Sequence, residues 1–228
     1  MAFLIRNDFY TSIESTDLDV LTSANDNVLN DAIETSKLML ESYIRDRFDV
    51  STLFPDVLIF DINKNYITGN KVVLTAEDWL FASSYVVGDL VNDSASGLVY
   101  KCILDASGIV PTNATYFELA GVNNSIYDVI LGGTGNLPSN TTYFSVGESR
   151  NPLLIRLMVD LVLYDIHSRL SPRNIPEHRI QRHDDVIKYL KAIADPRSNV
   201  NPNFPLIDYG TNRGVDISFG STENLNSY

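Results

Sequence analysis

Three stretches of the chain repeat their apolar residues with the 3.6-residue period of an amphipathic helix. The first covers residues 25–48, and its apolar positions are Val28, Leu29, Ala32, Ile33, Leu38, Met39, Leu40, Tyr43 and Ile44. This spacing predicts one long helix with a broad buried stripe. Asn25 or Asp26 can cap its start, because short polar side chains accept hydrogen bonds from the first free backbone amides. Residues 7–23 predict one or two short helical turns before it.

The other two helical stretches follow each other at residues 151–170 and 176–195. The first is apolar almost all round, which predicts a central buried helix, and Asn151 with Pro152 is a good start signal. The second predicts an amphipathic helix whose inner stripe comprises Ile180, His183, Ile187, Leu190 and Ala194, with Val186 and Ile193 beside them. Because the loop between them is short, we expect the two helices to form an antiparallel pair.

Residues 51–150 have a different pattern, with short Val-, Thr- and Tyr-rich runs between Gly- and Asn-rich turns, as in small β domains. An internal repeat lies here. Residues 100–121 align without gaps with residues 127–148, at an offset of 27 and with nine identities in 22 positions. Each copy reads as a strand, a Gly turn, a Pro turn and a "TYF" that enters a second strand. This predicts two packed copies of one hairpin unit.

These patterns together predict an α+β protein. A small helical bundle is expected from residues 1–50 and 151–196, with residues 51–150 inserted as a small all-β domain. Residues 197–228 are rich in Pro, Asn, Gly and Ser, and we expect an extended tail in which "VDISF" (215–219) alternates like a strand.

Composition is that of a globular protein, with 44% hydrophobic and 20% charged residues among 228. No run approaches the roughly 18 apolar residues of a membrane span. The first ten residues are too short an apolar run for a signal peptide, so we expect the protein to remain in the cytoplasm where it is made. Cys102 is the single cysteine, and we interpret it as a small apolar strand residue.

The net charge of −12 is unevenly distributed. Residues 1–165 hold 9 Lys/Arg against 22 Asp/Glu, a net −13, whereas residues 166–228 hold 8 against 7, a net +1. A protein that binds DNA by itself needs clustered positive charge to displace counterions from phosphates. The acidic first part therefore argues against such binding, although acidic walls would let DNA slide past without adhering.

Candidate catalytic chemistry is sparse. His178 and His183 are five positions apart, which places them roughly 140° apart around a helix, unlike the four-apart pair of a helical zinc site. We expect His183 to be a core histidine, and no Gly-rich phosphate loop, nucleophile elbow or cysteine metal pattern occurs. The sequence therefore predicts no catalytic residue, metal or cofactor. A hydrolase built on His183 and Asp184 is the alternative.

A basic segment near the C-terminus holds seven of the 17 positive charges. Its members are Arg169, Arg173, Arg179, Arg182, Lys188, Lys191 and Arg197. One interpretation is a solvated helix surface. The other is a docking surface for an acidic protein or for the acidic part of a second copy, a head-to-tail contact of the kind that closes into a ring.

The helical blocks resemble the head–tail adaptor (head-completion) proteins of tailed bacteriophages of the Mu-like prophage group. About 95 residues in two blocks carry the resemblance. The end of the long helix matches through Tyr43, Ile44, Arg47, Phe48 and Asp49. The second block matches through Asp160, Tyr164, Pro172, Arg182, His183, Asp184, Tyr189 and Leu190. His183 departs from the usual aromatic residue, and residues 50–150 replace what is ordinarily a short connection.

The resemblance implies a structural virion protein and no enzyme. Such adaptors form a ring, commonly a dodecamer, beneath the capsid portal and connect it to the next tail component. The implied partners are the portal protein, other neck or tail proteins, further copies of the chain and genomic DNA passing through the lumen without sequence-specific binding; no membrane is involved. The expected location is the head–tail neck of the virion, assembled in the host bacterial cytoplasm. The basic segment would contact the portal or a neighbouring subunit.

The insert is similar to small β modules of the chitin-binding type. The matching residues are Trp79, Tyr85, Gly88, Asp89, Val91, Tyr100, Pro111 and Tyr116. This similarity implies an aromatic sugar-binding surface, for which the candidates are Trp79, Tyr85, Tyr100, Tyr116 and Tyr143. The other interpretation is that these aromatics form the core of the module or a ring contact. A carbohydrate-binding adhesion protein of the virion is thus the alternative function.

Overall fold

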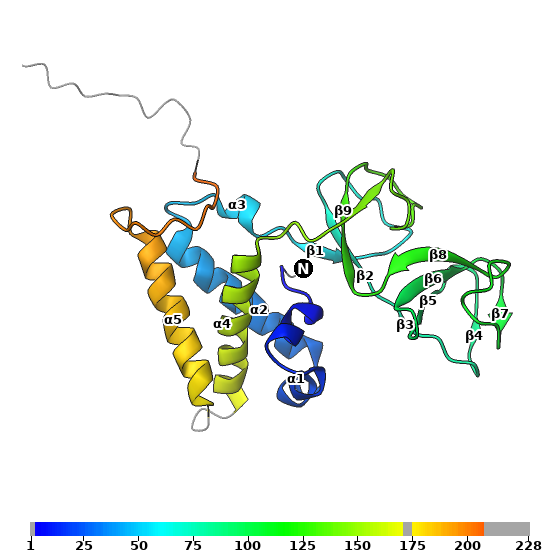
Figure 1. Ribbon diagram of the computed structural model, residues 1–228, viewed down its shortest axis with the longest axis horizontal. Helices are drawn as coiled ribbons and strands as arrows, with labels where there is room; N and C mark the ends of the chain where they lie inside the picture. Colours follow the sequence, from blue (N-terminus) through cyan, green and yellow to red (C-terminus); the bar gives the residue numbers. More distant parts are fainter. Residues whose placement is uncertain (1–2, 171–174, 208–228) are drawn as a thin grey trace, which may run out of the picture.

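The two ends of the described chain form helices and its middle forms strands (Figure 1). The computed structural model describes residues 3–170 and 175–207. About 37% of the chain is helix and 20% is strand, with several small sheets. The mixed α+β class expected from the sequence is therefore confirmed.

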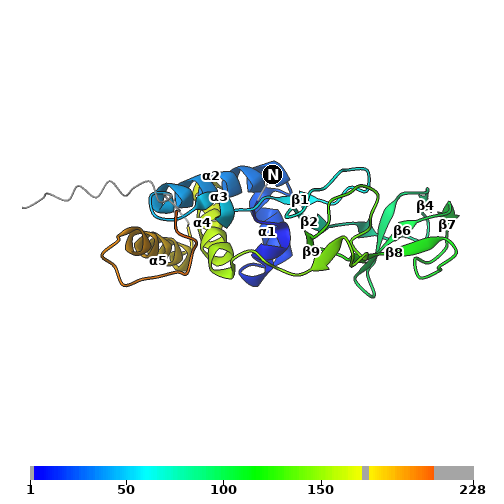
Figure 2. The same cartoon turned by 90° about the horizontal axis from the view of Figure 1, so that it is seen from above.

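The helices lie together on one side of the molecule and, with residues 195–207, are called the helical lobe. They are the 3₁₀ helix η1 (Arg6–Thr11) and the α-helices α1 (Ser15–Thr22), α2 (Asp26–Ile44), α3 (Val50–Leu53), α4 (Pro152–Leu170) and α5 (Glu177–Ala194). α2, α4 and α5 contact one another, and α1 and η1 pack on α4 (Figures 1 and 2). Segments from both ends of the chain thus share one hydrophobic core.

The two helix start signals act as predicted. The Asn25 side chain accepts a hydrogen bond from the backbone amide of Asn27 at 3.0 Å, at the start of α2. The Asn151 side chain accepts one from the amide of Leu153 at 2.9 Å, and α4 begins at Pro152. Each cap satisfies a backbone amide that has no partner within its helix.

Two positions of the expected buried stripes were wrong. Leu38 of α2 is 64% exposed and Ile180 of α5 is 40% exposed. In α5 the inward position belongs to Arg179, which is 5% exposed. The buried face of α5 is therefore shifted toward Arg179, Val186 and Ile193, whereas Leu190 is buried as expected.

The first part of the expected tail is bound to the helical lobe. Phe204 is buried and its ring packs edge-on against Phe48, with ring centroids 5.5 Å apart. The amide of Asp49 donates to the carbonyl of Pro205 at 2.9 Å. Residues 208–228, which include "VDISF", lie outside the described residues.

The strands form the β lobe, which contains two similar units. The first, module 1, is a sheet with the order β1-β2-β9-β10. Its strands are β1 (Val57–Ile59), β2 (Lys71–Leu74), β9 (Ser125–Val129) and β10 (Phe144–Val146). β1 and β2 are parallel, and the other neighbours are antiparallel.

Module 2 is a sheet with the order β3-β5-β6-β8 and a small sheet of two further strands. The four strands are β3 (Glu77–Asp78), β5 (Leu90–Asp93), β6 (Leu98–Cys102) and β8 (Phe117–Val122). The small sheet pairs β4 (Ser84–Tyr85) with β7 (Ala106–Ser107). Here too the first neighbours, β3 and β5, are parallel and the others are antiparallel.

The C-terminal halves of the two modules have the same backbone hydrogen bonds. Residue 103 donates to the carbonyl of residue 116 at 2.8 Å, and 27 positions later residue 130 donates to the carbonyl of residue 143 at 2.9 Å. Cys102 pairs with Phe117 as Val129 pairs with Phe144. The two copies of the sequence repeat therefore have the same fold.

The N-terminal halves also correspond, at an offset of 19. The amide of Phe60 donates to the carbonyl of residue 73 at 2.9 Å, and Trp79 donates to residue 92 at 2.8 Å. The amides of Gly69 and Gly88 donate to the carbonyls of residues 129 and 102, both at 2.8 Å. Tyr, Gly and Val recur at 66, 69 and 72 and again at 85, 88 and 91.

Module 2 is consequently nested inside module 1. In module 2, residues 93 and 98 pair across a short turn between β5 and β6. The equivalent residues of module 1, 74 and 125, also pair, but the whole of module 2 lies between them in the chain. The β lobe is a duplicated module in which one copy occupies the hairpin turn of the other.

One buried charge cluster joins the lobes where the chain returns from β10 to α4. The Arg150 side chain is fully buried. It donates to both carboxylate oxygens of Asp8 at 2.8 Å, to Glu148 and to the carbonyl of Phe3. Burial works to lower the pKa of the guanidinium, but the hydrogen bonds to Glu148 and Asp8 outweigh it, so the pKa is raised and the charge is retained.

Candidate functional site

α5 forms the outer edge of the helical lobe and carries most of the cations expected to contact a partner (Figures 1 and 2). Five of the seven candidates lie on α4 or α5: Arg169, Arg179, Arg182, Lys188 and Lys191. Arg197 follows α5, and Arg173 lies outside the described residues. The helix pair therefore brings most of them to one end of the molecule, but their surroundings differ.

Arg179 was wrongly assigned to this surface. Its side chain lies between α5 and the N-terminal segment, and its Nη2 donates to the carbonyl of Ser12 at 3.0 Å. Burial, and then the nearby charge of Arg182, lower the pKa of its guanidinium. Arg179 was missed as a core residue because its long apolar stem can occupy an inward position while its head finds a polar partner.

Two further cations are held by carboxylates of α4. Arg182 Nη1 lies 3.2 Å from Asp160 Oδ1, and the Asp160 side chain is largely buried. Arg169 Nη2 lies 2.7 Å from Asp165 Oδ2, one helical turn away. These contacts neutralise part of the charge predicted for docking, and the Asp160–Arg182 pair also links α4 to α5.

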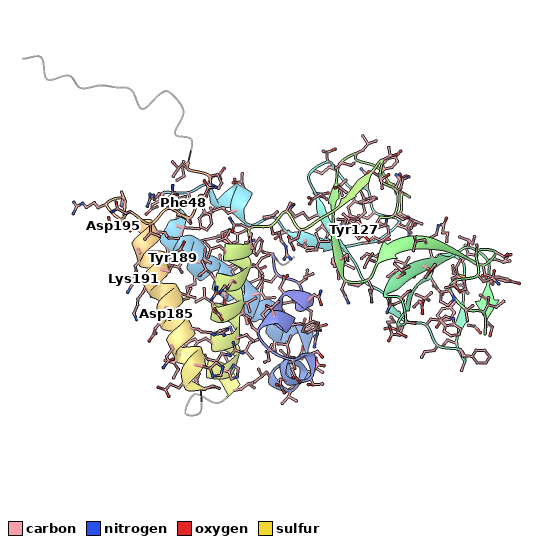
Figure 3. The ribbon with its side chains drawn as sticks, in the orientation of Figure 1. Phe48, Tyr127, Asp185, Tyr189, Lys191 and Asp195 are labelled. Atoms are coloured by element: carbon pink, nitrogen blue, oxygen red, sulfur yellow. The ribbon has the colours of Figure 1, made fainter. Side chains whose placement is uncertain are left out.

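The remaining cations, Lys188, Lys191 and Arg197, are exposed and are called the cation patch. The nitrogen of Lys188 lies 3.7 Å from Asp185, but both side chains are about three-quarters exposed, so this pair contributes little. Figure 3 shows Asp185, Lys191 and Asp195 along α5 and its end. The patch is the exposed part of the predicted surface whose cations are not held by a carboxylate of α4.

Arg47 has a structural role that sequence reasoning missed. Its Nη1 donates to the carbonyls of Ile193 at 2.7 Å and Asp195 at 3.3 Å, at the C-terminal end of α5. The last carbonyls of a helix carry partial negative charge and favour a cation there. The guanidinium also lies over the Phe48 ring, 5.1 Å from its centroid. The one indication of this contact in the sequence was an arginine just after the predicted long helix.

The histidines do not converge. The His183 ring stacks on Tyr164 with centroids 4.0 Å apart, between α5 and α4. His167 Nδ1 lies 2.6 Å from the carbonyl of Leu163 within its own helix. Among residues 3–170 and 175–207, no group of three His, Cys, Asp or Glu side chains is arranged to hold a metal ion. The hydrolase alternative thus has no metal-binding cluster to support it there.

The five candidate aromatics of the β lobe are half-buried and pack in two separate places. Trp79, Tyr85, Tyr100 and Tyr116 surround the buried residues of module 2. Tyr143 packs on the core of module 1, with Phe60, Tyr66 and Phe144. The Tyr85 hydroxyl accepts a hydrogen bond from the amide of Leu80 at 2.7 Å. These side chains stabilise two module cores and do not form one shared aromatic face.

Each module instead exposes aliphatic side chains at an equivalent corner. Corner 1 comprises Ile67, Thr68, Ile130 and Leu131 of module 1. Corner 2 comprises Val86, Val87, Ile103 and Leu104 of module 2. All eight residues are exposed, and only the structure shows that the two sets correspond.

A groove of about 610 Å³ lies between the lobes. Its apolar wall includes Leu29 and Ile33 of α2 and Val57 and Val73 of module 1. Arg6 in this wall is paired with Asp19 and Asp26.

In the described part of the chain, no helix combines the length and apolar character needed to cross a membrane. Comparison of the sequence with protein-family models and curated proteins, and of the structure with solved structures, gives no match.

Proposed function

We propose that the chain is a structural virion protein whose copies form a ring that connects the capsid portal to the tail and lets DNA pass. In this proposal α2, α4 and α5 form the small adaptor bundle, the β lobe is an insert, and the protein has no catalytic role. Its partners are the portal protein, other neck or tail proteins and further copies of itself.

The supporting observation is that the two sequence blocks resembling the adaptor family pack around one core. Leu40 of α2, Met158 of α4 and Leu190 of α5 are fully buried members of the same cluster, although about a hundred residues separate the blocks. The β lobe lies beside this core along the long axis of the molecule (Figure 1). Such an arrangement lets an insert be added without disturbing the helices that the family resemblance concerns.

The cation patch is the proposed contact with the portal or with a neighbouring subunit. Lys188 and Lys191 belong to α5, which lies on the side of the helical lobe away from the β lobe (Figure 1), and Arg197 follows this helix. Residues 1–165 carry a net −13, so an acidic surface is available on every further copy. The same acidity suits a lumen through which DNA moves, since fixed cations there would retain phosphates.

Carbohydrate binding remains the second candidate because of the Tyr-x-x-Gly-x-x-Val pattern in both modules. The placement of the aromatics favours the adaptor. Sugar recognition by stacking requires exposed aromatic faces, whereas Trp79, Tyr85, Tyr100 and Tyr116 are partly buried against the core of module 2.

The test is electron microscopy and mass photometry of the full-length protein, alone and with portal assemblies. Rings with a central channel, or binding to the portal, are expected. Reversing the cation patch (Lys188→Glu, Lys191→Glu, Arg197→Glu) should weaken that contact, whereas Arg45→Glu, at an exposed position after α2, should not. A protein that neither forms rings nor binds portal, but binds glycans in a screen, would replace the adaptor proposal with the second candidate.

A further inference from the structure

The groove between the lobes, here called the inter-lobe groove, has an apolar wall and an exposed apolar residue beside it. Leu29 and Ile33 of α2 and Val57 and Val73 of module 1 belong to the wall of this groove of about 610 Å³. These four side chains are buried, whereas Ile59, which also lines the groove, is 70% exposed. A further segment that covers Ile59 would therefore remove apolar surface from water.

β1, which lies next to this groove, is an edge strand that in the described chain pairs with β2 alone, in parallel. The amide of Phe60 donates to the carbonyl of Val73 at 2.9 Å. Backbone groups alternate in direction along a strand, so those of residues 57 and 59 point away from β2. The carbonyl of residue 59 accepts from the Tyr66 hydroxyl at 3.4 Å. The amides of residues 57 and 59 and the carbonyl of residue 57 are the groups that an added strand can bind.

Two charged residues at the rim of the groove are available to a further segment. Glu34 of α2 is exposed, and the Lys64 amine lies 5.9 Å from the centroid of the Tyr66 ring. Within residues 3–170 and 175–207 neither Glu34 nor Lys64 takes part in an ion pair, whereas Arg6 at the same rim has two. An incoming segment can therefore approach one carboxylate and one ammonium group without competing with an existing ion pair.

The last described residue lies beside the C-terminal end of α2, and residues 208–228 continue from there (Figure 1). The amide of Ile207 donates to the carbonyl of Arg47 at 3.3 Å, and Leu206 forms a β bridge with Phe48. Residues 208–228 are therefore attached at one end of the helix that forms a wall of the inter-lobe groove.

The segment that follows residue 207 is long enough to enter the groove of its own molecule. Along the direction of α2, Glu34 lies about 20 Å from residue 47, at a rise of about 1.5 Å per residue. The first six residues of the segment span about the same distance when extended, at roughly 3.3 Å each. Lys37 Nζ of α2 lies 3.5 Å from Asp56 Oδ1, so the start of β1 is beside this path. The residues that come next then reach the groove.

These next residues include the run "VDISF" (215–219), which has the alternation of a half-buried strand. Its apolar residues Val215, Ile217 and Phe219 are separated by Asp216 and Ser218. A strand with this pattern turns its apolar side chains to one face and its polar side chains to the other. Such a strand fits a groove that is apolar on its inner side and open to solvent on its outer side.

The charged residues of the segment complement those at the rim of the groove. Arg213 is the sixth residue of the segment, which places it level with Glu34 in the extended path described above. Asp216 follows three positions later and has the opposite charge to Lys64. Exposed ion pairs of this kind contribute little energy, but they favour one register of the added strand.

We propose that residues 215–219 occupy the inter-lobe groove of their own molecule as a strand added to β1. Val215, Ile217 and Phe219 face the apolar wall and cover Ile59. The segment comes from the same molecule because its attachment beside α2 gives it a high effective concentration at the groove. The added strand contacts α2 and module 1 together, so it holds the β lobe against the helical lobe. This contact goes beyond the proposed adaptor function and does not depend on ring formation.

Amide hydrogen exchange of the whole chain, followed by NMR, tests the added strand. In the double variant Ile217→Asp and Phe219→Asp, the amides of Val57 and Ile59 should exchange at least tenfold faster than in the wild type, because the added strand no longer protects them. Leu225→Asp, in the same segment but outside the alternating run, is the matched control and should exchange like the wild type. Unchanged exchange of both amides in the double variant would overturn the proposal.

A pair of introduced cysteines tests which molecule supplies the strand. Ile59→Cys combined with Ile217→Cys should form a disulfide within one molecule on mild oxidation, while the buried Cys102 stays free. Ile59→Cys combined with Leu225→Cys is the control pair and should form its disulfide at least tenfold more slowly. Equal rates for the two pairs, or a disulfide found only between two molecules, would overturn the intramolecular contact. Ring formation and portal binding are measured separately, so failure of this contact leaves the adaptor proposal standing.

Discussion

Arg150 and Asp8 are 142 positions apart in the chain and are joined by two hydrogen bonds of 2.8 Å each. The pair lies where the N-terminal segment, the end of the β lobe and the start of α4 meet. Because the Arg150 side chain is fully buried, its position is fixed by the carboxylates of Asp8 and Glu148 and by the carbonyl of Phe3. The cluster therefore fixes the segment that follows β10 to the N-terminal part of the helical lobe.

Replacing Arg150 by Ala should therefore be strongly destabilising. Removal of Arg150 leaves the Asp8 carboxylate, whose side chain is 10% exposed, without this cation, although the amide of Ile5 still donates to its Oδ2 at 2.8 Å. The expected loss is on the order of 3–5 kcal/mol in the free energy of unfolding, measured by chemical denaturation. Arg150→Lys should lie between the wild type and Arg150→Ala, because it keeps the charge and loses the two-pronged geometry. A loss below about 1 kcal/mol for Ala, the range of an exposed ion pair, would contradict the role given to the cluster.

Gly121 should not tolerate a side chain. Its φ is +153°, and a Cβ there would lie 2.5 Å from the hydroxyl oxygen of Tyr127 and 2.9 Å from Leu74 Cδ2. The Tyr127 hydroxyl, which accepts from the amide of Val122 at 2.7 Å, would have to move. Gly121→Ala should cost about 2–4 kcal/mol, seen as a lower thermal midpoint of the β lobe. Gly97, with positive φ and no atom near its Cβ position, is the control, and Gly97→Ala should cost roughly 1 kcal/mol from backbone strain alone. Equal losses would show that the clash at Gly121 is relieved.

The contact between Arg47 and the end of α5 should be measurable. Arg47→Ala removes two hydrogen bonds to the carbonyls of residues 193 and 195 and the favourable charge at the helix C-terminus. A loss of roughly 1–2 kcal/mol is expected, together with faster amide hydrogen exchange in the last turn of α5. Arg45→Ala, two residues earlier at an exposed position, should change neither quantity. Unchanged exchange in Arg47→Ala would show that α5 ends without help from this side chain.

Cys102 should be chemically inert in the folded protein. It is fully buried in β6, and burial raises the pKa of its thiol, so the reactive thiolate is scarcer at neutral pH than for a free cysteine. Its sulfur also donates to the carbonyl of residue 104. A thiol reagent such as a maleimide should react only after unfolding in denaturant. Rapid labelling under native conditions would mean that module 2 opens locally.

The helices were predictable because their signals are local. Asn25 and Asn151 mark the starts of α2 and α4 in the sequence as they do in the structure. The error in α5 has a physical reason. Arg179 and Ile180 are adjacent and both carry apolar methylene groups, so periodicity alone could not decide which of them faces inward. In the structure Arg179 faces inward, where its guanidinium donates to the carbonyl of Ser12.

The duplication in the β lobe was predictable only in its second half. Residues 100–121 and 127–148 share enough side chains for alignment. In the first half, Tyr, Gly and Val recur but most neighbours differ, and the shared feature is the backbone hydrogen bonding. The order of the module halves along the chain also obscures the duplication. Module 2 follows the first half of module 1 by 19 positions and precedes the second half by 27, so no single offset aligns the modules.

The candidate site was predictable as a cluster of cations but not as a surface. The sequence shows that Arg169, Arg182, Lys188 and Lys191 lie on two successive helices, and the four-residue spacing of Asp165 and Arg169 allows their ion pair within α4. It does not show that Asp160 pairs with Arg182, because that contact depends on how α4 and α5 are turned. The two corners were missed entirely, because their correspondence follows from the strand pairing of the two modules.

The nesting of module 2 gives the β lobe an adjustable length. Leu74 and Ser125 pair with each other where module 2 leaves and rejoins module 1. A turn of the kind that joins Asp93 to Leu98 could close this gap directly, and another whole module could be placed in that turn of module 2 in the same way. Each such change would shorten or lengthen the β lobe by one module while the Arg150 cluster and the helices kept their positions. The length of the β lobe can therefore change in evolution without a change in the helical lobe that carries it.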